Sequence, residues 1–188
     1  MHKAKLLVIS GPSAGVGKDT ILNMFLTAHS DWFHPLSTTT RMPRANEINA
    51  QQMNFVSHQQ FEKWVSEDKF LEYFDVGGNL YGSLKEPIEE LLKRGQNVIL
   101  RKDVHGALAI KEKIPSALII MLVPDKWQAL EKRIRARATE NEATIQKRLK
   151  LAKSEMAYQD RFDHIIVNPT GNPEKALTDL EKVVAENS

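Results

Sequence analysis

The sequence of 188 residues contains no cysteine, which excludes disulfide bonds, thiol nucleophiles and cysteine-bound zinc. It also has little net charge, because 26 lysines and arginines against 24 aspartates and glutamates leave only +2. A dedicated nucleic-acid-binding protein is typically far more basic. Long hydrophobic runs are lacking too: residues 6–9, the longest near the start, are too few for a signal peptide or a membrane span. We therefore expect a cytoplasmic protein without a nucleic-acid or membrane partner.

What is present resembles an average globular protein, with 41% hydrophobic and 27% charged residues, and the length suits one domain spanning residues 1–188. Apolar, β-branched runs predict buried strands at residues 5–10, 97–100, 117–123 and 164–167. Apolar stripes at helical spacing lie between and after them, and the last helix is predicted to begin at Asn172 as N-cap with Pro173 in its first turn. This alternation predicts an α/β fold with a central parallel sheet flanked by helices.

Residues 36–83 interrupt the alternation with a segment rich in threonine, arginine, asparagine and glutamine. Short strands are predicted at residues 53–56 and 70–76, and a helix around residues 61–65 with Ser57 as N-cap and Gln60 in the capping-box position. We interpret this segment as an insertion into the α/β core.

A glycine-rich turn, GPSAGVGKDT at residues 11–20, follows the first predicted strand and leads into a helix. Such a turn surrounds a phosphate with backbone N–H groups, the helix N-terminus adds its dipole, and a lysine reaches the outer phosphates. The alternative is a plain glycine turn with a surface lysine. The turn has five residues between Gly11 and Gly17, one more than the usual pattern, and Asp19 replaces the usual hydroxyl residue. Its position between strand and helix favours a nucleoside triphosphate site.

Further motifs follow in a fixed order along the chain. They are STTTRMPR at residues 37–44, FLEYFDVGGNLYGS at 70–83, LRKDVHGA at 100–107, LEKRIRAR at 130–137, Arg148 with Leu149, and IVN at 166–168. The six histidines show no metal-ligand spacing, so no metal site made by the protein itself is expected. The cationic run at residues 132–137 is diluted by nearby glutamates, which favours a lid or a solvated helix over an RNA-binding surface.

Together and in this order the motifs resemble the guanylate kinase family over residues 5–184. The resemblance implies a P-loop fold with a core of about residues 1–35, 95–130 and 158–188. It also implies a GMP-binding insertion of about residues 36–90 and a helical lid of about residues 131–157. The implied activity is ATP-dependent phosphorylation of GMP, and of dGMP, to the diphosphate with release of ADP. Mg²⁺ is implied as a cofactor bridging the phosphates of ATP, and the oligomeric state, monomer or homodimer, is left open.

The resemblance also implies roles for individual residues. The implied ATP-binding residues are Gly11, Pro12, Ser13, Ala14, Gly15, Val16, Gly17, Lys18, Asp19, Thr20 and Asn168. The implied GMP-binding residues are Ser37, Arg41, Arg44, Glu72, Tyr81, Ser83 and Asp103, with Ser37 and Glu72 reading guanine and Arg41, Arg44 and Tyr81 clamping the phosphate. The implied catalytic residues are Lys18, Arg133, Arg137 and Arg148.

Two departures from the family pattern have the most weight: the lengthened glycine loop, and Met53 at a position where a tyrosine is usual. They keep two other functions open. One is a guanylate-kinase-like binding module that has lost catalysis, and the other is a related kinase for a different phosphorylated acceptor.

Overall fold

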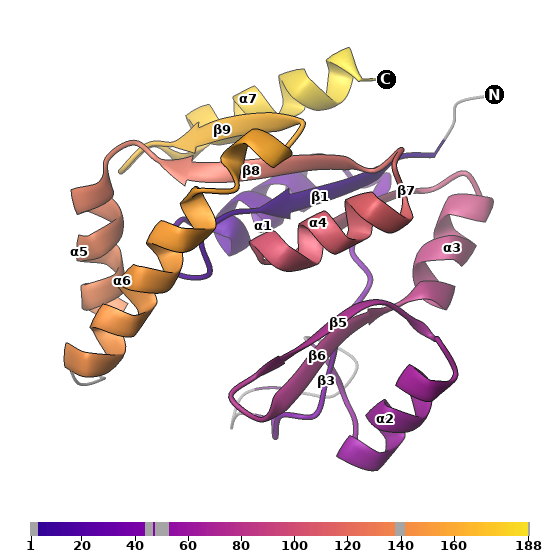
Figure 1. Ribbon diagram of the computed structural model, residues 1–188. Coiled ribbons are helices and arrows are strands. Elements are labelled where there is room, and N and C mark those ends of the chain that lie inside the picture. The colour runs from indigo at the N-terminus through magenta and orange to yellow at the C-terminus, as the bar shows by residue number, and fades with distance from the viewer. Residues whose placement is uncertain (1–3, 44–46, 48–52, 138–141, 188) are drawn as a thin grey trace.

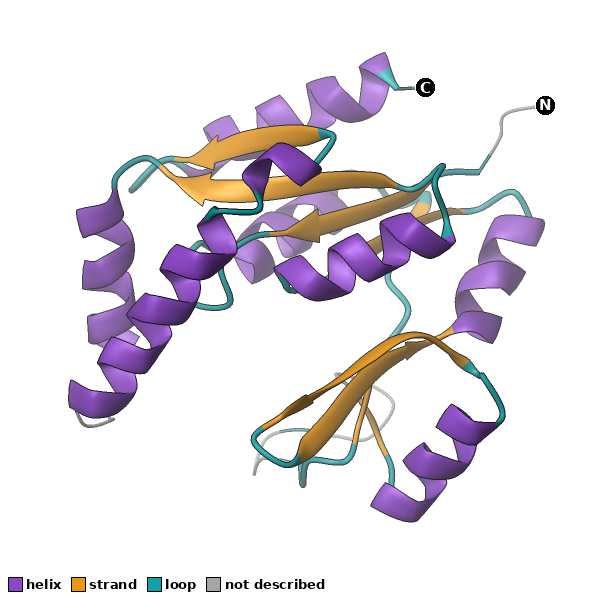
Figure 2. Cartoon of the chain, viewed as in Figure 1, coloured by secondary structure: helices purple, strands orange, loops and turns teal. Residues whose placement is uncertain are grey.

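The computed structural model describes residues 4–43, 47, 53–137 and 142–187. Arg44, which is predicted to bind GMP, lies outside these residues. Arg137 is described only as the last residue of a helix. The described chain forms a five-stranded sheet covered by helices, a smaller four-stranded sheet, and a pair of helices at one end (Figure 1, Figure 2).

The central sheet has the strand order β2-β7-β1-β8-β9, and all its neighbours are parallel. Its strands are β1 (Leu6–Ser10), β2 (Trp32–Phe33), β7 (Asn97–Arg101), β8 (Leu118–Pro124) and β9 (His164–Asn168). The predicted fold class is confirmed, and each of the four predicted strands is present. The two-residue edge strand β2 was not predicted.

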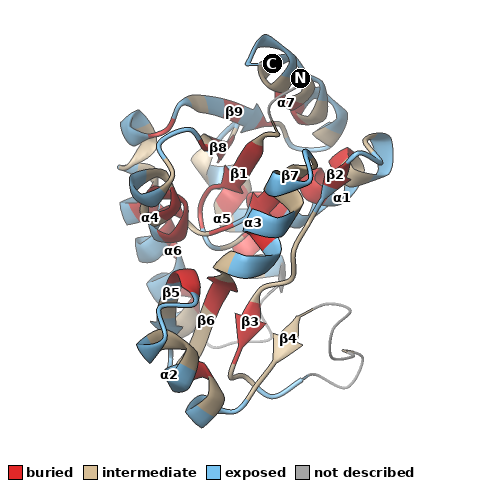
Figure 3. Cartoon of the chain, turned by 90° about the vertical axis from the view of Figure 1, so that its right-hand side faces the viewer, coloured by how far each residue is buried: buried red, intermediate tan, exposed pale blue. Residues whose placement is uncertain are grey.

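Alternate side chains of the three inner strands, β1, β7 and β8, enter two separate hydrophobic clusters. In β1, Leu7 and Ile9 belong to one cluster, whereas Leu6 and Val8 belong to the other. Since successive side chains of a strand point to opposite faces, these inner strands are buried on both faces, whereas Ile165 and Val167 of the edge strand β9 are exposed. This explains why the strands read as continuous apolar runs, and Figure 3 shows the buried residues concentrated along them.

Helices cover the two faces. One face packs against α1 (Lys18–Ala28) and α7 (Pro173–Glu186), and the other against α3 (Lys85–Lys93) and α4 (Val104–Lys113). The predicted cap of α7 is confirmed, because the Asn172 side chain accepts a hydrogen bond from the Lys175 N–H. Among the described residues, no helix is both long and apolar enough to cross a membrane.

The predicted insertion forms its own sheet, in the order β4-β3-β6-β5. It consists of β3 (Thr38–Thr39), β4 (Asn54–Phe55), β5 (Phe70–Val76) and β6 (Asn79–Leu84), together with α2 (His58–Ser66). Phe61 of α2 stacks on Phe70 of β5 with ring centroids 4.2 Å apart. The Ser57 hydroxyl accepts from the Gln60 N–H, as predicted for the N-cap. A small aromatic core thus joins this helix to this sheet.

The remaining helices, α5 (Trp127–Arg137) and α6 (Glu142–Met156), lie side by side at one end of the central sheet (Figure 1). Leu130 and Ile134 of α5 and Ile145 and Leu149 of α6 join the same hydrophobic cluster as α1. The short 3₁₀ helix Gln159–Arg161 leads from α6 to β9. The two helices are therefore anchored to the core next to the glycine-rich turn.

Candidate functional site

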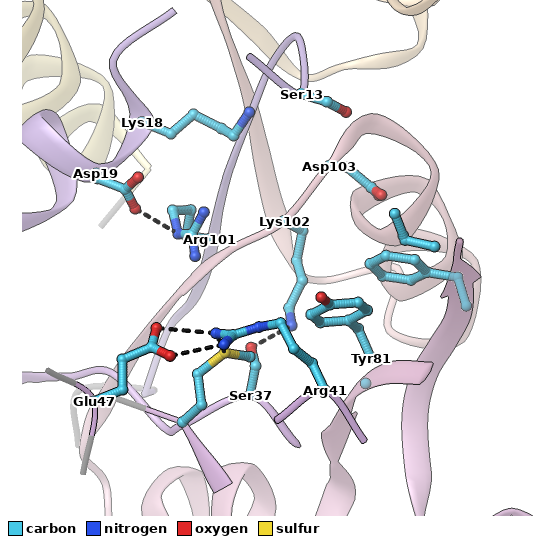
Figure 4. Close-up of a pocket in the computed structure, with 14 residues that line it drawn as sticks. Ser13, Lys18, Asp19, Ser37, Arg41, Glu47, Tyr81, Arg101, Lys102 and Asp103 are labelled. Atoms are coloured by element: carbon cyan, nitrogen blue, oxygen red, sulfur yellow. Dashed lines mark hydrogen bonds and ion pairs between the residues drawn. The ribbon is translucent and has the colours of Figure 1, made fainter. Parts of the chain in front are cut away.

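A cavity of about 480 Å³ lies where the central sheet meets the smaller sheet (Figure 4). Core residues lining it come from the turns that follow β1 and β7, at the carboxyl ends of parallel strands, where α/β proteins bind their ligands. The lining residues are Ser13, Lys18, Asp19, Ser37, Arg41, Glu47, Met53, Phe74, Val76, Tyr81, Gly82, Arg101, Lys102 and Asp103. The cavity thus joins the glycine-rich turn to the predicted GMP-binding segment.

The glycine-rich turn requires glycine at both of its ends. Gly17 has φ +92° and precedes α1 as its N-cap, and a Cβ there would lie 2.5 Å from the Asn168 side-chain nitrogen. Gly11 has φ +144°, and a Cβ there would lie 2.4 Å from the Leu122 carbonyl oxygen. No side chain caps the first turn of α1. Its N–H groups and helix dipole therefore suit an anion.

Lys18, the first residue of α1, folds back over this turn. Its Nζ donates to the carbonyl oxygens of Gly11 at 2.9 Å and Pro12 at 2.5 Å, and the residue is only 8% exposed. Burial disfavours the charged ammonium and lowers the pKa of Lys18 to about 8. The lysine is thus held inside the turn, at the cavity wall.

Glu155 of α6 reaches the same turn and was not singled out from the sequence. Its carboxylate accepts from the Ser13 N–H at 2.7 Å and from the Ser13 hydroxyl, and the residue is 2% exposed. Glu155 continues the apolar stripe of Ile145, Leu149 and Ala152 along α6. Its place on the buried face of a helix could have identified Glu155 from sequence, because a buried carboxylate needs a specific partner.

The other residues predicted to bind ATP or to act in catalysis differ in whether they contact the turn. Arg133 of α5 donates to the Gly15 carbonyl at 3.4 Å and to the Thr170 hydroxyl at 3.0 Å. Asn168, buried at the end of β9, donates to the Val16 carbonyl at 2.8 Å and so fixes the backbone of the turn. Thr20 and Arg148 are exposed on α1 and α6 and do not line the cavity.

Arg41 follows β3 and forms a bidentate ion pair at the cavity. Its two terminal nitrogens donate to the Glu47 carboxylate at 2.7 and 2.9 Å, which raises the pKa of Arg41 above its usual value. The Met53 sulfur lies 3.6 Å from the same guanidinium, and Tyr81 of β6 lines the cavity nearby (Figure 4). An arginine fork, a carboxylate and a thioether therefore occupy the predicted phosphate clamp.

Glu72 of β5 is deeply buried and has an unexpected partner. Lys102, which directly follows β7, places its Nζ 2.9 Å from Glu72 Oε1 and donates to the Ser37 hydroxyl at 3.1 Å. Glu72 is 4% exposed and Lys102 6%, and neither carboxylate oxygen receives a hydrogen bond of good geometry from the described residues. Ser37 and Glu72 are thus brought together as predicted, with Lys102 between them. Lys102 was missed because a lysine between Arg101 and Asp103 at a strand end suggests solvent exposure.

Three further acidic or hydroxyl residues complete the site. Asp103 is the N-cap of α4 and accepts from the Gly106 N–H at 2.7 Å, while it also lines the cavity. Ser83 is buried in β6 opposite Glu72 and does not line the cavity. Asp19 pairs with Arg101 at 2.9 Å, an ion pair that bridges the turn and the end of β7.

Known proteins resemble this chain along its whole length. The family model described as guanylate kinase matches residues 3–187. A guanylate kinase of Carboxydothermus hydrogenoformans is 42% identical over 98% of this chain and 89% of its own length, and one of Synechocystis sp. is 39% identical over 98% and 95%. The crystal structure of guanylate kinase from Anaplasma phagocytophilum matches with a TM-score of 0.78, covering 100% of this chain and 88% of that one. At 24% identity, this last likeness shows the fold alone.

Proposed function

The chain belongs to the guanylate kinase family, and we infer that it transfers the γ-phosphoryl group of ATP to GMP, giving ADP and GDP. One observation carries the assignment to this cavity. The glycine-rich phosphate loop lines the same cavity as Ser37 and Lys102, and the Lys102 ammonium lies 2.9 Å from the buried carboxylate of Glu72. The glycine-rich loop suits a triphosphate, and the Glu72 carboxylate suits the edge of a base that offers two N–H donors.

For the ATP side, we assign the triphosphate to the loop of residues 11–17 and to Lys18. Backbone N–H groups at the start of α1 and the lysine ammonium are the donors that a phosphate takes. Lys18 now donates to two loop carbonyls, and phosphate oxygens would replace these neutral acceptors with charged ones. Asn168 contributes by supporting the loop backbone.

For the GMP side, Arg41, Arg44 and Tyr81 would bind the phosphate, and Ser37 with Glu72 would bind guanine. The carboxylate of Glu72 can accept from both N1–H and the 2-amino group, a donor pair that adenine lacks. Because an unmatched buried carboxylate is costly, such a site rejects the wrong base strongly. Ser83 and Asp103 would support this wall, one from β6 and the other at the start of α4.

Phosphoryl transfer needs no covalent nucleophile from the protein. A phosphate oxygen of GMP attacks the γ-phosphorus, the bond to the bridging oxygen breaks, and ADP leaves. Negative charge spreads over the oxygens in the transition state, so positioning and positive charge provide most of the catalysis. We assign this charge to Lys18, Arg133, Arg137 and Arg148, of which Arg133 already contacts the phosphate loop.

Magnesium is proposed as the metal that neutralises the phosphates of ATP. Among the described residues, no three His, Asp or Glu side chains cluster into a metal site. Mg²⁺ takes oxygen ligands and often binds through one or two carboxylates plus the phosphates of a substrate. The Asp19 carboxylate, which lines the cavity in the first turn of α1, fits that requirement. The cytoplasmic location expected from the sequence stays a prediction.

A coupled assay of ADP release from ATP and GMP tests the function. We expect turnover by the unaltered protein and a loss of at least about a hundredfold in Lys18→Met, because the transition state loses a buried charge. The matched control is Lys93→Met, an exposed lysine of α3 whose loss should leave turnover unchanged. A folded Lys18→Met variant with full activity would refute the role of the loop. GMP binding without any turnover would instead favour a non-catalytic binding module.

A further inference from the structure

Lys102 carries an inference that deepens the proposed function and rests on it. The Lys102 side chain is 5% exposed and the Glu72 side chain 2%. Burying these two charges costs free energy, because both are removed from water. Asp103, the next residue, caps α4, but Lys102 caps nothing. Its ammonium lines the cavity and contacts Ser37 and Glu72, the two residues assigned to the base. In Figure 4 it extends from the end of β7 toward Ser37.

The polar atoms of this group stand in a specific order. Lys102 Nζ, a donor, is 2.9 Å from Glu72 Oε1, an acceptor, and Oε2, a second acceptor, is the other oxygen of the same carboxylate. A Cβ placed on Gly106 would lie 3.4 Å from Glu72 Oε2, which locates that oxygen at the start of α4. Both oxygens are buried, and neither accepts a hydrogen bond of good geometry from the described residues, although Lys102 Nζ is in ion-pair contact with Oε1. Lys102 and Ser37 line the cavity and Glu72 lies buried in contact with Lys102, so the group consists of a donor, an acceptor and a second acceptor.

Guanine offers the complement of this order along one edge. Its O6 is an acceptor, and its N1–H and 2-amino group are donors. Adenine places an amino donor where guanine has O6 and an unprotonated ring nitrogen where guanine has N1–H. Adenine would thus set its donor against an ammonium and its acceptor against a carboxylate. Hypoxanthine keeps the oxo group and N1–H and lacks only the 2-amino group.

We propose that Lys102 is a specificity-determining residue, whose ammonium donates to the 6-oxo group of the base while Glu72 accepts from N1–H and the 2-amino group. Lys102 also pairs with the Glu72 carboxylate at 2.9 Å, so neither charge is buried alone. Ser37 holds the ammonium in place from the other side.

Two nucleotide analogues separate these contacts. In 6-thio-GMP a sulfur, a weak acceptor, replaces O6, while N1–H and the 2-amino group remain. In IMP the 2-amino group is missing, while O6 and N1–H remain. The measurement is kcat/KM for GMP, 6-thio-GMP and IMP with the unaltered protein, Lys102→Met and Lys102→Gln. Lys111→Met is the matched control, because Lys111 is also ion-paired, to Asp163 at 2.8 Å, but does not line the cavity.

In Lys102→Met, the preference for GMP over 6-thio-GMP should fall by about tenfold or more, the usual effect of a hydrogen bond to a charged group. The preference for GMP over IMP should change by less than about threefold, because that contact belongs to Glu72. Lys102→Gln keeps a donor, so its preference for GMP over 6-thio-GMP should fall less. Lys111→Met should match the unaltered protein in both ratios.

An unchanged preference for GMP over 6-thio-GMP in both Lys102 variants would overturn the inference. The KM for ATP and the melting temperature report whether a variant is folded. If Lys102→Met does not fold, the same comparison is made with Lys102→Gln. No turnover of GMP by the unaltered protein would refute the proposed function instead. Calorimetric binding of GMP and 6-thio-GMP to the same variants would then decide the role of Lys102.

Discussion

At the scale of single residues, the cations that line the cavity already have acceptors within the protein. Arg41 pairs with Glu47, Arg101 with Asp19, and Lys102 with Glu72, while Lys18 donates to two backbone carbonyls. A phosphate that binds to such a cation must compete with this acceptor. The protein therefore holds the positive charges of the cavity in place through acceptors of its own.

Lys18 gives a prediction about pH. Its pKa of about 8 in the free protein results from burial, and phosphate oxygens beside it favour the charged form and so raise that pKa. Above pH 8, binding of ATP must therefore be accompanied by uptake of a proton, and affinity must fall as pH rises. At pH 9, one unit above the pKa, the dissociation constant should be about tenfold larger than at pH 7.

Calorimetry of a non-hydrolysable ATP analogue, in two buffers with different ionisation enthalpies, measures both quantities. The expected result is uptake of nearly one proton at pH 9 and almost none at pH 7. Equal affinity at the two pH values with no proton uptake would contradict the assignment of Lys18 to the phosphates. The Lys93→Met variant should behave like the unaltered protein, since Lys93 is exposed on α3.

At the scale of secondary-structure elements, α6 is attached to the phosphate loop by Glu155. The carboxylate accepts from both the N–H and the hydroxyl of Ser13. Glu155→Ala removes these acceptors and leaves the Ser13 N–H without a partner. We expect the free energy of unfolding to fall by about 2 kcal/mol, the usual cost of losing hydrogen bonds to a buried charged group.

Urea denaturation measures this effect, with Glu89→Ala as the control at an exposed position on α3. Glu155→Gln keeps one acceptor oxygen, so its loss of stability should be smaller. The KM for ATP should also rise in Glu155→Ala, because the loop loses a fixed contact. If Glu155→Ala were as stable as Glu89→Ala, the attachment would have no energetic role.

Strands with a continuous apolar run and helices with a local cap could be predicted from sequence. Elements that depend on pairing with a distant segment could not. The strands β1, β7 and β8 read as apolar runs because each contributes to both hydrophobic clusters, whereas β9 contributes Ile166 to one cluster and its apolar run continues through the exposed Ile165 and Val167. The caps Ser57 and Asn172 were predicted because capping depends on neighbours within three residues. The edge strand β2, with only Trp32 and Phe33, has too short a pattern to detect.

Residues of the candidate site also divide into those that a local pattern identifies and those that depend on distant contacts. The glycine loop and Lys18 are contiguous, so their chemistry could be inferred before the fold. Ser37 and Glu72 were identified by family resemblance, and the structure places both beside Lys102. The contact of Lys102 with Glu72 and that of Glu155 with Ser13 join residues far apart in sequence. The position of Glu155 on a buried helix face indicates that it has a partner, but no local pattern identifies the partner of either residue, so both contacts required the structure.

At the scale of the whole molecule, the net charge of +2 hides an uneven distribution. The cavity lining includes Lys18, Arg41, Arg101 and Lys102 together with Asp19, Glu47 and Asp103. These charges lie between the α/β core and the four-stranded sheet, where two small phosphorylated ligands would meet. A nearly neutral total is thus compatible with a site built for phosphates.

Selectivity among nucleoside monophosphates tests the central claim most directly, because it engages the loop, the phosphate clamp and the base-binding wall in one measurement. The measurement is kcat/KM for ADP release from ATP with GMP, dGMP, AMP, CMP and UMP. We expect turnover with GMP and dGMP and at least about a thousandfold less with AMP, since adenine leaves the buried Glu72 carboxylate unmatched. AMP turnover equal to that of GMP would contradict the account.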